Sequence, residues 1–319
     1  MQIVTGYFKI LISIWTLSAF VVHGQQSEHY TQYQFNQFNF NPAVAGTKRC
    51  IDIRTGYRLQ WLGIDGTPQT GFANAHGPLS FSRKKRNLFG PKSGIGVMVN
   101  RDKFGPFSFL QAQLAYALHL PINKDWRLSI GVSLGIKQAA FGTSELTTEF
   151  NDPAIPTSSQ SFLIFPDGRL GLWLADKKTY FSFSVHNLFG NRLDEIGPES
   201  QLQRHFYLTA GRQIKLEKKW VFVPSFFFMK TKNTPIDFHL SGLFNLDNKF
   251  SFGVGLRRTD AITAQARVKL FNFISVGYSF DFVISKLNKN IWYTHELTGG
   301  FNSCSNYGNS STTSCATFE

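Results

Sequence analysis

The sequence predicts an all-β protein: a transmembrane, antiparallel outer-membrane β-barrel of about 14 strands, with an N-terminal segment that plugs or covers it. Three observations predict this fold. A secretory signal opens the chain, the segments after it repeat an alternation of apolar and polar residues, and no segment has a helical pattern that would cover a soluble sheet. Because the apolar faces are long and carry large aromatic residues, we expect them to contact lipid, with the polar faces lining a lumen.

The first 24 residues have the features of a signal peptide. Lys9 precedes an apolar run from Ile10 to Val22, and a small-residue cleavage site ends at Gly24. The alternative is an uncleaved membrane anchor, but a spanning helix needs roughly 20 apolar residues and this run is shorter. No other long apolar run occurs, so we expect no transmembrane helix in the mature chain. Cys50, the first cysteine, lies too far from the cleavage site for a lipid anchor.

The alternation is clearest at 51–61 and 127–137, where odd and even positions differ in polarity throughout. Successive residues of a strand face opposite sides, so each segment has one apolar and one polar face. The second, sixth and ninth strands show the pattern least clearly, the ninth because Phe226, Phe227 and Phe228 interrupt it. The expected strands lie at about 51–62, 70–79, 93–101, 108–120, 126–138, 168–174, 179–187, 204–213, 220–230, 236–245, 249–257, 261–270, 272–283 and 291–301.

The lengths of the connections predict the orientation of the barrel. Most links after even-numbered strands are short, whereas those after the fifth strand, about Ala139–Asp167, and the seventh, about Leu188–Gln203, are long. Short turns face the periplasm in such barrels and long loops face outward, so we expect the N-terminus on the periplasmic side. The exception is the long basic link after the second strand, which is either a solvated turn or a docking site for an acidic periplasmic partner. Its cations are Arg83, Lys84, Lys85 and Arg86.

Composition and charge agree with one large barrel. The chain holds 33 Phe and 27 Gly but only 17% charged residues, and its net charge is +13. The cations are spread over the polar faces of the strands, and no nucleic-acid-binding motif accompanies them, so we exclude nucleic acid as a partner. We divide the chain into the signal peptide (1–24), a plug or periplasmic segment (25–49), the barrel (50–302) and a Ser/Asn/Thr-rich tail (303–319).

The charged residues on the polar faces have two interpretations. They could line a conducting pore, or they could pair across a packed lumen, where each buried charge needs a partner. We favour the packed lumen, and because the first and last strands meet on closure we expect Glu296 to approach Arg54 or Arg58. The predicted lumenal charge network consists of Asp52, Arg54, Arg58, Arg257, Arg267, Asp281 and Glu296.

The segment before the first strand repeats aromatic–Asn pairs and ends in a turn formed by Asn41, Pro42 and Gly46. Asn-Pro favours a turn, and glycine permits a positive φ. The simpler interpretation is a turn that leads into the first strand. The alternative, which we favour, is that residues 25–48 fold into the lumen as a plug or cover it as a lid, because they carry too much apolar area to remain in water.

The tail holds Cys304 and Cys315, which either form a local disulfide or remain free thiols in a disordered segment. A local disulfide would leave Cys50 unpaired.

The sequence predicts no enzyme, cofactor or metal site. Its eight His and three Cys show no metal-binding spacing, and no Gly-rich phosphate loop is present. An outer-membrane hydrolase is the enzyme alternative, and it would need a nucleophile held beside a histidine. No compelling nucleophile accompanies the histidines in the strand-like segments.

A series of short motifs covers nearly the whole mature chain, and its order and spacing resemble the PorP/SprF family of outer-membrane proteins of the type IX secretion system. The motifs are Gln34–Gly46, Tyr57–Trp61, Thr67–Thr70, His76–Pro78, Asn100–Pro106, Ala115–Leu120, Gln203–Gly211, Gly255–Arg258, Gly277–Phe282 and Thr294–Leu297. The chain departs from the family pattern by adding residues 302–319 after the last strand.

The resemblance implies a barrel in the bacterial outer membrane that works with the type IX apparatus. Some members belong to the core machine, and others export or anchor one secreted surface protein such as an adhesin. We therefore expect support of secretion or surface anchoring. The expected partners are type IX components in the periplasm and outer membrane, a secreted surface protein as cargo, and outer-membrane lipid. The alternative is a porin-like passive channel.

Overall fold

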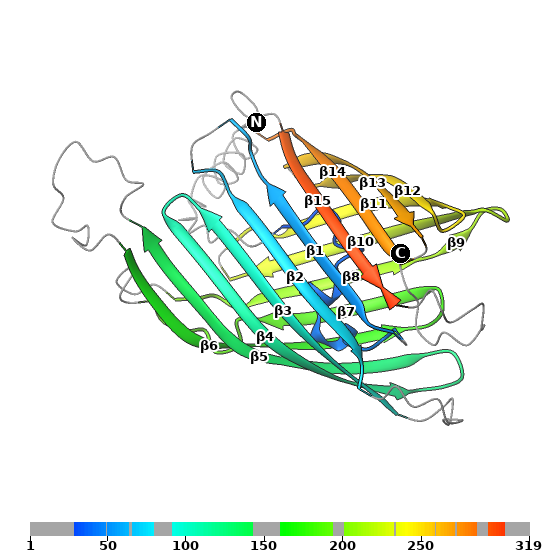
Figure 1. Cartoon of the computed structure of the whole chain (residues 1–319), viewed down its shortest axis with the longest axis horizontal. Helices are drawn as coiled ribbons and strands as arrows, with labels where there is room; N and C mark the ends of the chain where they lie inside the picture. The colour runs from blue at the N-terminus through cyan, green and yellow to red at the C-terminus, as the bar shows by residue number, and fades with distance from the viewer. Residues whose placement is uncertain are drawn as a thin grey trace, which may run out of the picture.

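The computed structural model describes residues 29–303 except 49, 64–65, 80–90, 143–159, 194–200, 233, 259, 272 and 286–292. In this part of the chain, fourteen long antiparallel strands and one strand of two residues form a closed barrel (Figure 1). Closure comes from the pairing of the first strand with the last and of β10 with β11. The strands are β1 (Asp52–Leu59), β2 (Gln69–Pro78), β3 (Lys92–Phe104), β4 (Phe107–Pro121), β5 (Arg127–Gly142), β6 (Gln160–Ala175), β7 (Thr179–His186), β8 (His205–Arg212), β9 (Ile214–Lys215), β10 (Trp220–Thr231), β11 (Asp237–Leu246), β12 (Phe250–Arg257), β13 (Ala261–Leu270), β14 (Ile274–Val283) and β15 (Tyr293–Asn302).

The short strand β9 continues β8 after a break, so the ring has fourteen members. β10 pairs with β8 as far as Ser225 and with β9 at Val221 and Phe222. Pro224 lies between these two paired stretches, and proline has no N–H to donate to a ladder. On the opposite side of the break, the N–H of Gln213 donates to the carbonyl of Lys178 at 2.7 Å and continues the pairing of β8 with β7. The prediction of an antiparallel barrel of about 14 strands is confirmed.

The two faces of the strands differ as the alternation predicts. Ile53, Tyr57 and Leu134 on the outer face are exposed, whereas Arg54 and Arg58 on the inner face are buried. An apolar outer surface and a polar interior suit a barrel in lipid. Among the described residues, no helix has the length and apolar character to cross a membrane.

The sixth strand is longer than the sequence indicates. It runs from Gln160 rather than from about residue 168, and β5 extends to Gly142, so the loop expected at about Ala139–Asp167 is confined to residues 143–159. β5 pairs with β6 along its whole length, but β7 pairs with β6 only from Leu170 onward (Figure 1). Pro166 is therefore tolerated, because it lies where β6 has no ladder on the β7 side.

The run of three phenylalanines in β10 keeps the alternation instead of breaking it. Phe227 is buried and faces inward, and Phe226 and Phe228 are partly exposed on the other face. An apolar side chain faces the lumen here because other aromatic residues fill the interior at this position.

The link lengths sort by barrel end, with exceptions. One end carries the short turns at 122–126, 176–178, 247–249 and 271–273, and the opposite end carries the connections at 143–159 and 187–204. The exception at the short-turn end is the long link 79–91. The exceptions at the other end include the short links 105–106 and 258–260.

Cys50, just before β1, is disulfide-bonded, so it is not left unpaired as a local disulfide within the tail would require. The signal peptide, the basic residues Arg83–Arg86 and the cysteines Cys304 and Cys315 lie outside the described residues.

Candidate functional site: the lumenal segment

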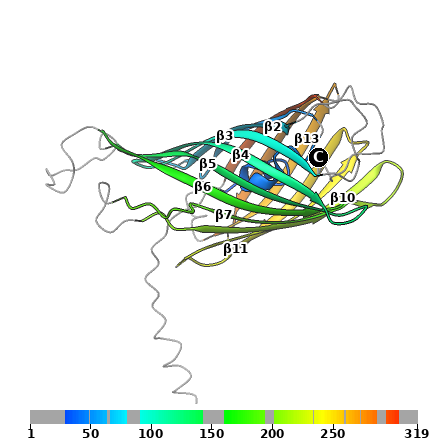
Figure 2. The ribbon, with the colours of Figure 1, turned by 90° about the horizontal axis from the view of Figure 1, so that it is seen from below.

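The N-terminal segment lies inside the barrel. Every residue from Tyr30 to Gly46 is buried, and we call this stretch the lumenal segment. It contains the short helix α2 (Gln37–Phe40) and the 3-10 helix η1 (Pro42–Val44), which Figure 2 shows enclosed by the strands. Its hydrogen bonds reach opposite sides of the ring, namely β14, β15, β1 and β2 on one side and β7 and β10 on the other.

The Asn-Pro turn places the end of the segment against β6 and β7. The side chain of Asn41 accepts from the N–H of Ala43 at 2.9 Å, with Pro42 at the start of η1, as expected of a helix cap. The amide of Asn41 also donates to Ser182 and to the carbonyl of Leu172, both at 2.8 Å. Asn41 therefore both closes the turn and attaches it to strands β6 and β7 of the barrel wall.

Two inward-facing glycines make room for this turn. A Cβ atom on Gly131 would lie 2.2 Å from the backbone nitrogen of Ala43, and one on Gly171 would lie 1.9 Å from the side-chain oxygen of Asn41. Gly46, at the end of the turn, has a φ of +72°, and its N–H donates to His76 at 3.2 Å. The glycine positions on the polar faces thus match the path of the lumenal segment.

The first ionic cluster holds the start of the segment. The guanidinium of Arg58 lies 2.7 Å from Asp281 and 3.2 Å from Glu296, and Arg257 lies 3.1 Å from Asp281. Glu296 accepts from the N–H of Thr31 at 2.7 Å, while the Thr31 hydroxyl donates to Asp281 at 2.7 Å. These four residues of the predicted charge network meet, and Glu296 approaches Arg58 rather than Arg54.

The second cluster contains the remaining predicted charges. Asp52 lies 2.9 Å from Arg54 and 2.7 Å from Lys48, which sequence reasoning did not select. The guanidinium groups of Arg54 and Arg267 lie 4.0 and 4.1 Å from the ring centre of Phe35. Arg267 therefore contacts an aromatic ring of the lumenal segment instead of a carboxylate.

A third cluster was missed entirely. Arg169 in β6 donates to the carbonyl of Asn39 at 2.6 Å and to the side chain of Gln111, and Asp167 accepts from Gln111 and from Gln113. The sequence does contain a signal for Arg169. It stands two residues before Gly171, so the two residues share one face of the sixth strand. Arg169 lies within the expected sixth strand at about 168–174, but the alternation there is among the least clear, so its face is not assigned from the sequence. Asp167 lies just outside that expected strand, whereas β6 as observed includes it.

Aromatic packing fills the space between the clusters. The rings of Tyr30 and Phe72 are 5.1 Å apart, and those of Phe40 and Phe227 are 5.0 Å apart. Tyr33 donates to Ser225 at 3.0 Å, and burial raises the pKa of its phenol to about 12, so it remains a neutral donor. The apolar side chains of the lumenal segment are thereby removed from water.

A closed barrel that is apolar outside and occupied inside by its own N-terminal segment defines a β-barrel protein of the bacterial outer membrane. The chain belongs to the PorP/SprF family, because residues 22–301 match the family described as type IX secretion system membrane protein PorP/SprF. The resemblance deduced from the motifs is thus confirmed, as is the outer-membrane location.

Several solved outer-membrane structures are similar to the chain. A Pseudomonas aeruginosa FadL homologue has 10% identity and a TM-score of 0.44, over 88% of this chain and 94% of that one. The Acinetobacter baumannii protein Omp33 has 10% identity and a TM-score of 0.45, over 80% and 99%. The Ralstonia pickettii toluene transporter TbuX has 8% identity and a TM-score of 0.48, over 84% and 92%. No curated protein matches the sequence.

Proposed function

We propose that this barrel is a non-catalytic component of the type IX secretion system that supports the secretion or surface anchoring of a partner protein, and that its lumenal segment is a plug. The observation that carries the proposal is the ionic attachment of that segment. The backbone N–H groups of Thr31 and Gln32 both donate to the buried carboxylate of Glu296, at 2.7 and 3.1 Å.

This arrangement favours a structural role over a passive channel. In an open pore, inward charges remain hydrated and available to passing solutes. Here Arg58, Asp281 and Glu296 are each 1% exposed, and they bind one another and the lumenal segment. Removing such a segment would leave the carboxylates of Glu296 and Asp281 without the hydrogen bonds that Thr31 and Gln32 donate to them, which is costly.

The histidines support the non-catalytic part of the proposal. His119 lies 2.6 Å from the hydroxyl of Ser129, the type of pair that a hydrolase would use, but its second ring nitrogen lies 2.9 Å from the carbonyl of Ala45. Both side chains are buried beneath the lumenal segment. A nucleophile in that position has no space for a substrate beside it.

Deleting the gene and comparing the surface proteome with that of the parent tests the proposal. We expect one surface protein to be mislocalised while other exported proteins remain, because family members share motifs while serving different partners. Failure of all type IX cargo together would assign the barrel to the core machine. An unchanged surface proteome with reduced solute uptake would contradict the proposal and support the porin alternative.

Single-channel recording gives an independent measurement. The purified barrel should show little ion conductance in a planar bilayer, and removal of residues 25–48 should increase it. Large conductance of the complete chain would contradict a plug.

A further inference from the structure

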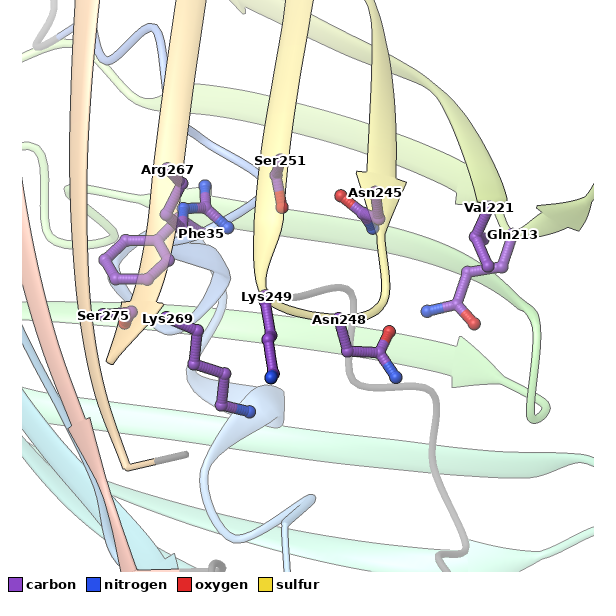
Figure 3. A pocket seen from close by; sticks show the side chains of 10 residues that line it. All are labelled: Phe35, Gln213, Val221, Asn245, Asn248, Lys249, Ser251, Arg267, Lys269 and Ser275. Atoms are coloured by element: carbon purple, nitrogen blue, oxygen red, sulfur yellow. The ribbon is translucent and has the colours of Figure 1, made fainter. Parts of the chain in front are cut away.

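A cavity of about 250 Å³ opens at the end of the barrel that carries the short turns. Its outer residues, Asn248 and Lys249, are exposed in the β11–β12 turn, and its inner residues, Arg267 and Phe35, are buried. The ten residues that line it, all in the described part of the chain, include no Asp or Glu (Figure 3). They are Phe35, Gln213, Val221, Asn245, Asn248, Lys249, Ser251, Arg267, Lys269 and Ser275.

Arg267 is an unusual buried cation. It is 9% exposed, and within the described residues its guanidinium forms no hydrogen bond and no close ion pair, although Glu296 acts on it electrostatically from a distance; its Nε is buried without an acceptor. Its observed contact is the ring of Phe35 at 4.1 Å. A buried guanidinium normally pairs with an anion, because an uncompensated buried charge is costly.

Two lysines add positive charge to the same cavity. Lys249 and Lys269 lie side by side, since the N–H of Lys269 donates to the carbonyl of Lys249 at 2.7 Å. Both side chains line the cavity together with Arg267 (Figure 3). Three cations around an opening without a carboxylate produce a positive potential that attracts anions.

We propose that this cavity binds an acidic side chain of a peptide segment from a periplasmic protein, with Arg267 as the principal partner of the carboxylate. The inference rests on the proposed role in secretion, which supplies a periplasmic partner and places the short-turn end in the periplasm.

The location and size of the cavity indicate this ligand. Apart from the turn residues Asn248 and Lys249 at its mouth, the cavity is lined from inside the barrel, so the hydrocarbon of the membrane does not reach its inner residues. Its volume suits one or two side chains rather than a large ligand. A guanidinium that packs on an aromatic ring keeps its N–H groups for a planar carboxylate, which arginine binds in a bidentate manner. Ser251 in the wall offers a hydroxyl group to a peptide backbone.

The test measures peptide binding by the purified full-length protein in uncharged detergent. The probe is a fluorescein-labelled peptide of alternating Glu and Gly, compared by fluorescence anisotropy with the same peptide carrying Gln in place of Glu. We expect the Glu peptide to bind and the Gln peptide to bind at least about 10-fold more weakly, because hydrogen bonds to charged groups are the stronger ones. Binding should weaken as ionic strength rises.

Variants locate the site. Arg267→Gln should weaken binding of the Glu peptide about 10-fold or more. The double variant Lys249→Gln/Lys269→Gln changes more accessible side chains and should also weaken binding of the Glu peptide. It provides the test if Arg267→Gln does not fold. The matched control is Lys177→Gln/Lys178→Gln, which removes two charges from the β6–β7 turn at the same barrel end but outside the cavity. The control should retain parental affinity.

Three results would overturn the inference. Equal weakening by the control would show attraction by net charge alone, and unchanged binding in the cavity variants would place the peptide elsewhere. Complete displacement of the peptide by inorganic phosphate at equal concentration would identify a small-anion site instead. These results are separable from the proposed function. Loss of a surface protein on gene deletion, with unaltered peptide binding by the cavity variants, would retain the secretion role and reject this site.

Discussion

Replacing Arg58 with methionine should destabilise the barrel strongly. Arg58 is 1% exposed and contacts two carboxylates, Asp281 and Glu296. Asp281 would keep Arg257 at 3.1 Å, so Glu296 is the group that loses its ion-pair partner. Breaking a buried pair from one side costs about 3–5 kcal/mol, and with one carboxylate affected we expect about 3 kcal/mol. Methionine fills much of the space of the arginine stem, which keeps the contribution from a cavity small.

The assay is urea denaturation in lipid vesicles, followed by the fluorescence of the tryptophans that remain after removal of residues 1–24. Arg258→Met is the control, because Arg258 is exposed and donates to the carbonyl of Ile236, and we expect a change within about 0.5 kcal/mol. Adding Glu296→Gln to Arg58→Met should recover part of the loss, since a neutral amide leaves no uncompensated charge. The coupling expected between contacting residues is about 0.5–3 kcal/mol.

A loss below about 1 kcal/mol for Arg58→Met, the value typical of an exposed ion pair, would refute the reasoning. The lumen would then be hydrated around the cluster, and its charges would not hold the lumenal segment in place.

Three further predictions concern the faces, the segment and the orientation. Val132→Arg places a charge on the lipid-facing surface and should cost about 2–4 kcal/mol near the bilayer centre. Ser133→Arg should impair assembly at least as much, because Ser133 is 0% exposed inside the barrel. Normal heat-modifiable mobility of the Ser133 variant in gel electrophoresis would contradict the packed lumen. Gly171→Leu should displace the Asn41 turn and increase conductance, whereas an unchanged conductance would show that the turn does not close the lumen. Cysteine introduced within 143–159 should react on intact cells with an impermeant thiol reagent in a Cys-free background, and cysteine at Arg83 should not; the reverse pattern would invert the orientation.

Period-two alternation determined most of the secondary structure. It placed fourteen strands at nearly their observed positions and assigned Asp52, Arg54 and Arg58 to the interior, because side-chain direction along a strand depends only on local parity. The aromatic content before the first strand likewise indicated that this segment leaves water, since apolar area must be buried somewhere.

The alternation of apolar and polar residues did not determine where β6 begins, or why this strand tolerates a proline. Pro166 is accommodated because β7 stops short of it, and the length of a neighbouring strand is not encoded in the residues around the proline. The same holds for Pro224, whose missing N–H coincides with the break between β8 and β9.

Only the tertiary structure decided which inward charges meet. Arg58 and Asp281 are 223 residues apart and become neighbours when β1, β15 and β14 pair during closure of the ring. Arg267 also faces inward but lies beside Phe35, and no carboxylate of the described residues forms a close ion pair with it. The sequence therefore determines which face a charge occupies, while the register and closure of the barrel determine its partner, because contacts across a lumen depend on strand pairings far apart in the chain.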